Sequence, residues 1–472
     1  MSRTGPPPAD RGLRLPTLLG LASGAVLVPL NSTMLAVALP TLRHEFGVSA
    51  STVAMLVTLY LGAVVIALPA SGVLGDRFGH RRIFLVGVAC FAASSLLAAA
   101  SQTFLVLALA RVLQAASGSL VSVSAVALVR LAAAQDRRGA AFGLFDMLVS
   151  TSAAVGPFIG GVLVSALNWR WLFLVAVPIA AVAAISVGLL LQVGADPPQT
   201  AKPATGTSPR PIDVIGLVLL AMVLVALLAS LHGSFGSADP LVWASVPILL
   251  ALFIGRELTA THPAVDLRLF RRGGYSAAVA GVLGTTVVLH ASFILVPLQV
   301  QELLHGSASV SGVVLLGISG VAALAAPFGG RASDPLGRRA PAVAGALLIT
   351  AALVLLWRIT PVATVPLLAG LLGVVGLGLG LSGSPRQAAA LEEVDAAATG
   401  MAAATYSTGR YLGGVLGATL AGSVLAGGVT SAGVGLGYGL LSGVGLAVAV
   451  LSLALPGPPR AGRPSAQERS IP

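Results

Sequence analysis

Charged residues are scarce in this chain. They make up 9% of the 472 residues, whereas hydrophobic residues make up 56%, and the mean hydropathy is +0.96. A soluble domain needs far more charge than this to cover its surface with polar groups. The composition therefore excludes an ordinary soluble enzyme and favours a protein whose surface faces lipid.

Cysteine and lysine are nearly absent as well. Cys90 is the single cysteine and lies within an apolar run, which excludes a disulfide and a thiolate metal site. Lys202 is the single lysine, and there is no phosphate-binding glycine loop with a lysine, which excludes intrinsic ATP-driven transport. A nucleophile elbow is absent too. The sequence thus predicts no enzyme activity, no cofactor and no metal.

Long apolar runs are what the chain has instead. Each is about long enough to cross a hydrocarbon core of roughly 30 Å, which takes about 20 helical residues. The runs are continuous rather than alternating, so they predict membrane-spanning helices. The first is too long for the core of a signal peptide and is interpreted as a retained helix. Fourteen spans fit the pattern, at 16–40, 51–72, 82–101, 104–130, 139–166, 170–192, 213–232, 241–257, 276–300, 308–329, 340–358, 363–385, 398–427 and 432–455.

Arginine supplies most of the charge that the chain does carry. The net charge of +11 could suggest nucleic acid, but the arginines lie in short loops between apolar runs, where they fit topology signals and contacts with anionic lipids. With fourteen spans, nearly all of the 27 Lys and Arg residues fall on one side, and the loops of the other side hold only Arg43, Arg170 and Arg358. The positive-inside rule then predicts a multi-pass protein of the inner or plasma membrane with both termini in the cytoplasm.

A long polar break divides the spans into two halves. It is rich in Pro, Thr and Ala, which is typical of a flexible linker. The predicted division is a disordered cytoplasmic N-terminus (1–15), an N-terminal six-helix bundle (16–192), a cytoplasmic linker (193–212), an inserted helix pair (213–257), a cytoplasmic loop (258–275), a C-terminal six-helix bundle (276–455) and a disordered cytoplasmic tail (456–472).

A weak internal repeat supports the two halves. The segment from Gly72 to Arg81 follows the second span, and the segment from Gly330 to Arg339 follows the tenth. Each combines an acid near a helix end with clustered arginines, which can clamp neighbouring helices by charge-assisted contacts. The alternative is a charged topology loop with no further role. The residues assigned to gating here are Gly72, Asp76, Arg77, Gly79, Arg81, Arg82, Asp334, Gly337 and Arg338.

The first of these segments resembles the signature loop of the major facilitator superfamily, G-x-L-x-D-R-x-G-R-R. Four further segments are similar to family motifs. These are Leu30 to Pro40 in helix 1, Arg111 with Gln114 in helix 4, Gly156-Pro157-Phe-Ile-Gly160-Gly161 in helix 5, and Ser407 to Gly414 with Arg410 in helix 13. Those in helices 1 and 13 are similar to motifs of the fourteen-helix drug:proton antiporter branch, the one in helix 4 to the R-x-x-Q signature of the superfamily, and the one in helix 5 to a motif associated with antiporters. Trp169 to Phe173, with Pro178, is similar to the start of helix 6. The helix 4 segment departs from its motif at Ala115, where the family usually has a glycine.

The resemblance implies an all-α polytopic membrane protein with the major facilitator fold, two six-helix bundles and an inserted helix pair. It also implies alternating access and efflux of a lipophilic small molecule, such as an antibiotic or a secondary metabolite, driven by protons as the coupling ion. Membrane lipids are the other expected partner, the expected state is a monomer, and no nucleic acid is expected.

Polar residues at membrane depth point to a site, because they are costly there. Arg111 and Gln114 are three residues apart on one helix face, and Asn31 lies at a similar depth at about 1.5 Å of rise per residue. The sequence therefore predicts a polar cluster of these three. The full set of candidate cavity residues is Asn31, Tyr60, Arg111, Gln114, Asp146 and His290.

Asn31 departs from the branch, whose members usually carry an aspartate at this position. Asparagine cannot ionise, so it cannot carry a proton. Either the coupling proton uses Asp146 or, second, His290, or Arg111 binds an anionic substrate and coupling is weak or absent. A third reading is a homologue that no longer transports and acts as a sensor or partner.

Structural readings stand beside these roles. Asp146 could pair with Arg137 or Arg138, and His290 could be a neutral core histidine. Arg410 could hold helices together without touching substrate. Pro157, which removes a backbone donor beside small glycines, could be a hinge or a plain packing kink.

Overall fold

The computed structural model describes residues 15–132, 138–190, 214–232, 240–260, 267–392 and 399–457, and all regular elements within them are helical. The first half contains α1 (Leu15–Phe46), α2 (Ala50–Phe78), α3 (His80–Ala99), α4 (Phe104–Ala132), α5 (Arg138–Ala166), α6 (Trp171–Leu174), α7 (Ala176–Ile185) and the π-helix η1 (Ser186–Leu190). A pair follows, α8 (Val214–His232) and α9 (Pro240–Thr259), and then the short η2 (Leu267–Arg271). The second half contains α10 (Gly273–Leu298), η3 (Gln299–Leu303), α11 (Ala308–Leu336), α12 (Arg339–Ile359), η4 (Thr360–Val362), α13 (Val365–Glu392), α14 (Thr399–Val424) and α15 (Ser431–Ser452).

All fourteen predicted spans coincide with these helices, the sixth being built from α6, α7 and η1 together. Within the described residues, 11 helical segments are long and apolar enough to cross a membrane. Several helices run past the predicted ends. The segments after spans 2 and 10 were predicted as loops. That is wrong for all but Gly79 in the first and Gly337 with Arg338 in the second, because α2 continues to Phe78 and α11 to Leu336, and the next helices begin at His80 and Arg339. A polar turn beyond the hydrocarbon keeps its helical hydrogen bonds until a glycine ends the helix.

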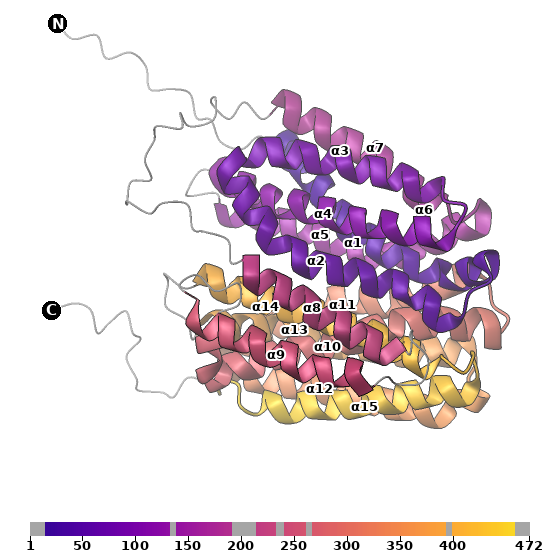
Figure 1. Cartoon of the computed structure of the whole chain (residues 1–472). Helices are drawn as coiled ribbons and strands as arrows, with labels where there is room; N and C mark the ends of the chain where they lie inside the picture. Colours follow the sequence, from indigo (N-terminus) through magenta and orange to yellow (C-terminus); the bar gives the residue numbers. More distant parts are fainter. Residues whose placement is uncertain are drawn as a thin grey trace, which may run out of the picture.

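The helices form two bundles that lie against each other (Figure 1). In the first, α1 packs on α5 and α3 packs on α4; in the second, α10 packs on α14 and α11 packs on α13. The bundles meet where α5 contacts α11, α2 contacts α14 and α1 contacts α10. The pair α8 and α9 lies outside both bundles, with α8 touching α2 and α14.

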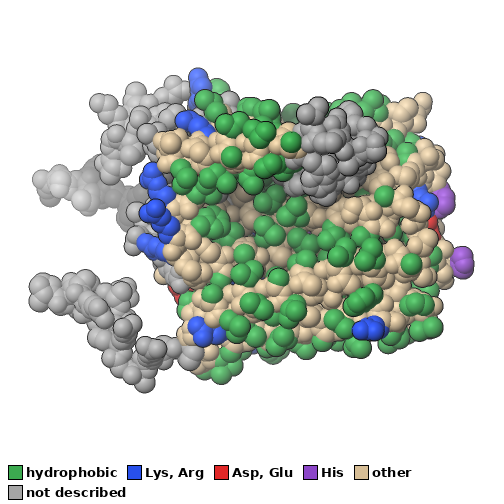
Figure 2. Space-filling model, turned by 60° about the horizontal axis from the view of Figure 1, so that its bottom comes forward, with side chains coloured by type: hydrophobic (Ala, Val, Ile, Leu, Met, Phe, Trp, Pro, Cys, Tyr) green, Lys and Arg blue, Asp and Glu red, His purple; other side chains and the backbone are tan. Residues whose placement is uncertain are grey.

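The flank of the molecule is apolar, and the arginines gather mainly at one end (Figure 2). On α4, for example, Leu105, Leu109 and Leu113 follow each other at four-residue spacing and are exposed. The opposite face of the same helix is buried inside the bundle and carries Arg111. An apolar outer face and a polar inner face are what a helix between lipid and a transport site requires.

The two copies of the internal repeat share a local geometry. Gly79 and Gly337 both have positive φ angles, of 88° and 74°, and each ends a helix. Such angles favour glycine because it lacks a Cβ atom. Two residues later, Arg81 donates from Nη2 to the carbonyl oxygen of Gly188 at 2.9 Å, and Arg339 donates from Nε to that of Leu455 at 2.9 Å. Each arginine thus ties the start of the third helix of its half to the end of the sixth.

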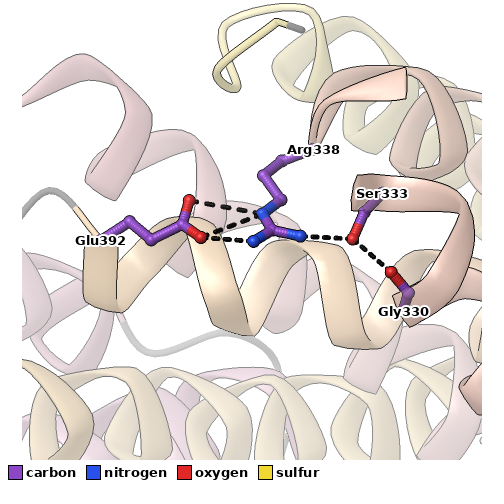
Figure 3. A network of polar contacts seen from close by, with 4 residues as sticks. All are labelled: Gly330, Ser333, Arg338 and Glu392. Atoms are coloured by element: carbon purple, nitrogen blue, oxygen red, sulfur yellow. Dashed lines mark hydrogen bonds and ion pairs between the residues drawn. The ribbon is translucent and has the colours of Figure 1, made fainter. Parts of the chain in front are cut away.

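The preceding residue differs between the copies. His80 contacts the Asp76 carboxylate at 3.1 Å, and that carboxylate is 70% exposed. In the second copy Arg338 reaches across to Glu392 at the end of α13 and also contacts Ser333, whose hydroxyl donates to the carbonyl of Gly330 at 2.6 Å (Figure 3). The side chain of Asp334 lies outside the part of the structure that is described. In the described residues the clamp is therefore made by the arginines and Glu392 rather than by Asp76.

We expect Arg81→Ala and Arg339→Ala each to lower the melting temperature in detergent, because each removes a charged donor from a helix-end carbonyl. A hydrogen bond to a charged group contributes about 1.5–3 kcal/mol, and partial exposure places these two at the lower end. Arg331→Ala is the matched control, since Arg331 is exposed and makes no hydrogen bond to another described residue. Equal melting temperatures for all three variants would contradict the clamp.

Candidate functional site

A buried arginine on α4 is the centre of the site. Arg111 donates from Nη1 to the Asn31 side-chain oxygen on α1 and to the Gln114 side-chain oxygen at 3.0 Å. Its guanidinium also lies 4.0 Å from the centre of the Tyr60 ring on α2. Arg111 and Gln114 are 0% exposed, and Asn31 and Tyr60 are buried as well. The structure thus brings four of the six candidate cavity residues together.

Hydrogen bonds fix this cluster to four helices. Gln114 donates from Nε2 to Ser95 Oγ on α3 at 2.8 Å, and Ser95 donates to the Phe91 carbonyl at 2.7 Å. Tyr60 donates its hydroxyl to the Val28 carbonyl of α1 at 3.3 Å. The bond to Ser95 orients Gln114 with its oxygen toward Arg111, because an amide offers one acceptor and one donor group.

All direct partners of Arg111 found in the described residues are neutral. Two amide oxygens and an aromatic face surround the guanidinium, and its buried Nε has no acceptor in the part of the chain that the structure describes. A charge at membrane depth is costly and is normally paired. The cluster therefore keeps a positive charge and a free donor, an arrangement that can bind a negatively charged or acceptor-rich group.

His290 lies apart from this cluster, on α10 at the junction of the bundles. Its Nδ1 is 3.1 Å from the Thr286 carbonyl one turn earlier. Gly414 of α14 approaches both His290 and Leu61 of α2, since a Cβ added to it would lie 3.2 Å from His290 Cε1 and 2.9 Å from Leu61 Cδ1. The ring therefore faces the contact between α2 and α14, where the two halves meet.

The other candidates stand as follows. Asp146 lies on α5, but its side chain is outside the described part of the structure, as are Arg137 and the Arg138 side chain. Arg410 on α14 is exposed, and its guanidinium lies 5.4 Å from the Tyr411 ring centre. The roles of both residues stay predictions.

The glycines around Pro157 pack α5 tightly between two helices. A Cβ added to Gly160 would lie 2.7 Å from the Met34 carbonyl oxygen of α1, and Gly156 also faces α1. Gly161 faces the other way, where an added Cβ would lie 2.7 Å from the Ala308 carbonyl oxygen of α11. The motif therefore packs α5 closely on α1 of its own bundle and on α11 of the other bundle, as small residues allow.

Hydrogen bonds between the halves cluster at this same end of the molecule. Arg43 of α1 pairs with Glu302 of η3, and Gln301 donates to the Val37 carbonyl at 3.0 Å. Ser309 of α11 donates to the Gly161 carbonyl at 3.2 Å and, from its backbone, to Ser165 Oγ at 3.0 Å. These bonds hold the two bundles together at this end, which the sequence predicts to be the outer one.

Sequence reasoning missed Arg386. The predicted span 363–385 stops just before it, which left it in a cytoplasmic loop. That placement is wrong, because α13 continues to Glu392 and buries the side chain to 1% exposure. Proline is tolerated inside membrane helices, so Pro385 does not end α13. Only a predicted span longer than 363–385 would have placed Arg386 inside the helix.

Comparison with known proteins identifies the family. The sequence pattern of the Major Facilitator Superfamily matches residues 21–290 and 276–472. The chain belongs to the major facilitator superfamily. Its members are transporters, in agreement with the expectation that this chain is not an enzyme. The major facilitator fold and the membrane location follow from the same finding.

Several curated relatives span most of the chain. It is 32% identical over 419 residues to the uncharacterized MFS-type transporter YwoD of Bacillus subtilis (strain 168), covering 88% of this chain and 91% of that one. It is 34% identical over 349 residues to the tetracenomycin C resistance and export protein of Streptomyces glaucescens, covering 73% of this chain and 63% of the relative. A multidrug resistance protein B homolog of Mycobacterium tuberculosis (strain ATCC 25618 / H37Rv) is 29% identical over 405 residues, or 84% and 73% of the two chains.

A solved structure shows the same fold. The crystal structure of a D-xylose-proton symporter aligns with a TM-score of 0.65 at 14% identity, covering 94% of this chain and 98% of that one. At this identity the likeness concerns the arrangement of the helices alone.

Proposed function

We propose that the chain exports lipophilic small molecules, such as antibiotics or other secondary metabolites, by alternating access. Relatives named for drug resistance and export support this class of substrate. Two bundles that meet at α5–α11 and α2–α14, with buried polar residues near the contact, suit a mechanism in which one bundle rocks against the other. The predicted domain boundaries, cytoplasmic termini and monomeric state belong to this proposal.

The neutral surroundings of Arg111 indicate the charge of the exported molecules. A pathway with an unpaired buried cation attracts substrates that bear a negative charge or strong acceptors, and it repels lipophilic cations. We therefore propose that the exported molecules are lipophilic anions or acceptor-rich neutral compounds. Arg111 would contact the polar group of the substrate, while the apolar walls would hold the rest.

Exchange for protons is the second candidate. His290 supports it, because the ring lies at the junction of α2, α10 and α14, which must rearrange when the halves rock. Asp146 on α5 remains the first carboxylate to consider for this role.

The test uses two fluorescent dyes and purified protein in proteoliposomes. 8-Anilinonaphthalene-1-sulfonate is a lipophilic sulfonate, and N-phenyl-1-naphthylamine has the same rings without the charge. We expect wild-type protein to transport the sulfonate and Arg111→Gln to slow it by about tenfold or more, since a charged hydrogen bond contributes about 1.5–3 kcal/mol. Arg331→Gln should leave transport unchanged.

A trapped pH dye shows in the same vesicles whether export is coupled to proton exchange. Sulfonate-driven proton movement that disappears in Asp146→Asn or His290→Gln would establish proton exchange through that residue. Sulfonate flux without proton movement would contradict proton exchange. If wild-type protein transported neither dye, and cells expressing it gained no resistance to any lipophilic compound, the export proposal would fail.

A further inference from the structure

A second buried arginine lies in the other half of the molecule. Arg386 is on α13, is 1% exposed, and adjoins an apolar cluster that includes Tyr275, Ala389 and Tyr406. It forms no ion pair with any described residue. Its one hydrogen bond to a described residue runs from Nη1 to Thr285 Oγ1 on α10 and is long, at 3.4 Å. A guanidinium cannot shed its charge in a protein, so a buried one needs compensation.

The unused donors of Arg386 lie on one edge of the guanidinium. Nε and Nη2 are both buried and have no acceptor in the described structure. This pair of N–H groups points in parallel, and its spacing matches two oxygens of a carboxylate, sulfonate or phosphate. A single carbonyl or hydroxyl would satisfy only half of this edge. An edge with two unused parallel donors among the described residues therefore favours a bidentate oxyanion.

The neighbouring helices are shaped around this side chain. Gly281 of α10 opposes it so closely that an added Cβ would lie 2.7 Å from Arg386 Cδ and 2.9 Å from Nε. Tyr406 of α14 lies within electrostatic range of both Arg386 and Arg410. Next to it, the buried Thr405 hydroxyl also lacks a partner among the described residues. Hydroxyl groups of Thr285 on α10 and Tyr406 on α14 thus lie near the cation on α13.

Arg111 and Arg386 occupy the fourth helix of their respective halves, but at opposite depths. Arg111 lies about 10 Å from the start of α4 at Phe104, and Arg386 lies about 9 Å from the end of α13 at Glu392. Both helices begin at the same side in the predicted topology, which is the outer side. Arg386 is therefore the inner cation and Arg111 the outer one.

We propose that Arg386 is a second anion-binding point of the transport route, which holds the bidentate oxyanion of a lipophilic acid near the cytoplasmic end before the molecule reaches Arg111. This proposal rests on the proposed export of lipophilic anions and narrows it to molecules that carry a carboxylate, sulfonate or phosphate. A molecule with a lone phenolate or carbonyl would use Arg111 but would leave half of the Arg386 edge empty.

Binding of the two dyes to purified protein tests the proposal. We expect Arg386→Lys and Arg386→Gln each to weaken binding of 8-anilinonaphthalene-1-sulfonate by about tenfold, because lysine keeps the charge but lacks the fork. Binding of N-phenyl-1-naphthylamine should stay within about twofold. Gly281→Ala, which displaces the guanidinium without removing it, should weaken sulfonate binding in the same direction. Gly370→Ala on α13 is the matched control, since nothing lies within 4 Å of its added Cβ.

Three results would overturn the proposal. One is that the variants keep their melting temperatures and either bind both dyes with equally weakened affinity or bind both with unchanged affinity. Another is a loss of stability in Arg386→Gln that Glu393→Gln or Asp395→Asn reproduces, since a carboxylate of the chain itself would then be the partner. The third is a variant that differs from wild type only in its response to phosphatidylglycerol in the vesicles, which would make a lipid phosphate the ligand. Because wild-type sulfonate transport and the Arg111→Gln effect are measured separately, failure at Arg386 leaves the export proposal standing.

Discussion

Gly312→Val is expected to reduce transport by about tenfold or more while the protein still folds. Gly312 lies on α11 at its contact with α5, and a Cβ added to it would lie 2.5 Å from the Pro157 carbonyl oxygen and 3.2 Å from Phe158 Cα. Both obstacles are backbone atoms, so a valine side chain can fit only if the bundles separate at this end. Overpacking of this kind costs about 1–3 kcal/mol, which shifts a two-state equilibrium by about five- to 150-fold.

The accessibility of the outer interface provides the direct measurement. Ser311→Cys, in a background with Cys90→Ser, should react slowly with a membrane-impermeant maleimide, because Ser311 is 0% exposed. Adding Gly312→Val should accelerate the reaction in parallel with the loss of transport. Gly370→Val is the control on α13, where nothing lies within 4 Å of the added Cβ. Normal transport by Gly312→Val would show that α5 and α11 need not close tightly during the cycle.

Most of the fold could be predicted because a membrane allows few alternatives. An apolar run of about 20 residues in lipid must be helical, and the sign of the loop charges orders the helices. The errors lie at helix ends, where polar residues leave the hydrocarbon without ending the helix. Thus α2 includes Asp76 and α13 includes Arg386, although both were expected in loops.

The candidate site was predictable only in part, for a physical reason. The depth and face of Asn31, Arg111 and Gln114 follow from the helical rise and the three-residue spacing, and the structure brings the three together. The stacking of Tyr60 on Arg111 depends on how α2 crosses α4, which no spacing within one helix determines. Burial of Arg386 depends likewise on Gly281 of another helix. The sequence therefore does not predict which side chains of neighbouring helices contact each other.

Asn31→Asp should reverse the charge preference at the outer cation. The Asn31 oxygen already accepts from Arg111 Nη1, so a carboxylate in its place needs no rearrangement to pair with the guanidinium. The charge that attracts an anionic substrate would be neutralised, and a substrate anion would also meet a like charge. We expect transport of 8-anilinonaphthalene-1-sulfonate to fall by about tenfold or more, given that charged hydrogen bonds contribute about 1.5–3 kcal/mol. Transport of lipophilic cations should rise.

Asn168→Asp is the matched control for this change. Asn168 is exposed at the predicted outer surface and accepts from the Arg170 backbone N–H at 2.9 Å, so the same substitution adds the same charge outside the cluster. A carboxylate at position 31 can also exchange a proton, so the pH dye should show substrate-driven proton movement that exceeds the wild-type signal. If Asn31→Asp transported the sulfonate at the wild-type rate, Arg111 would not contact the anion in the wild-type protein or in the variant. The neutral partners of that arginine would then have to be explained by helix packing alone.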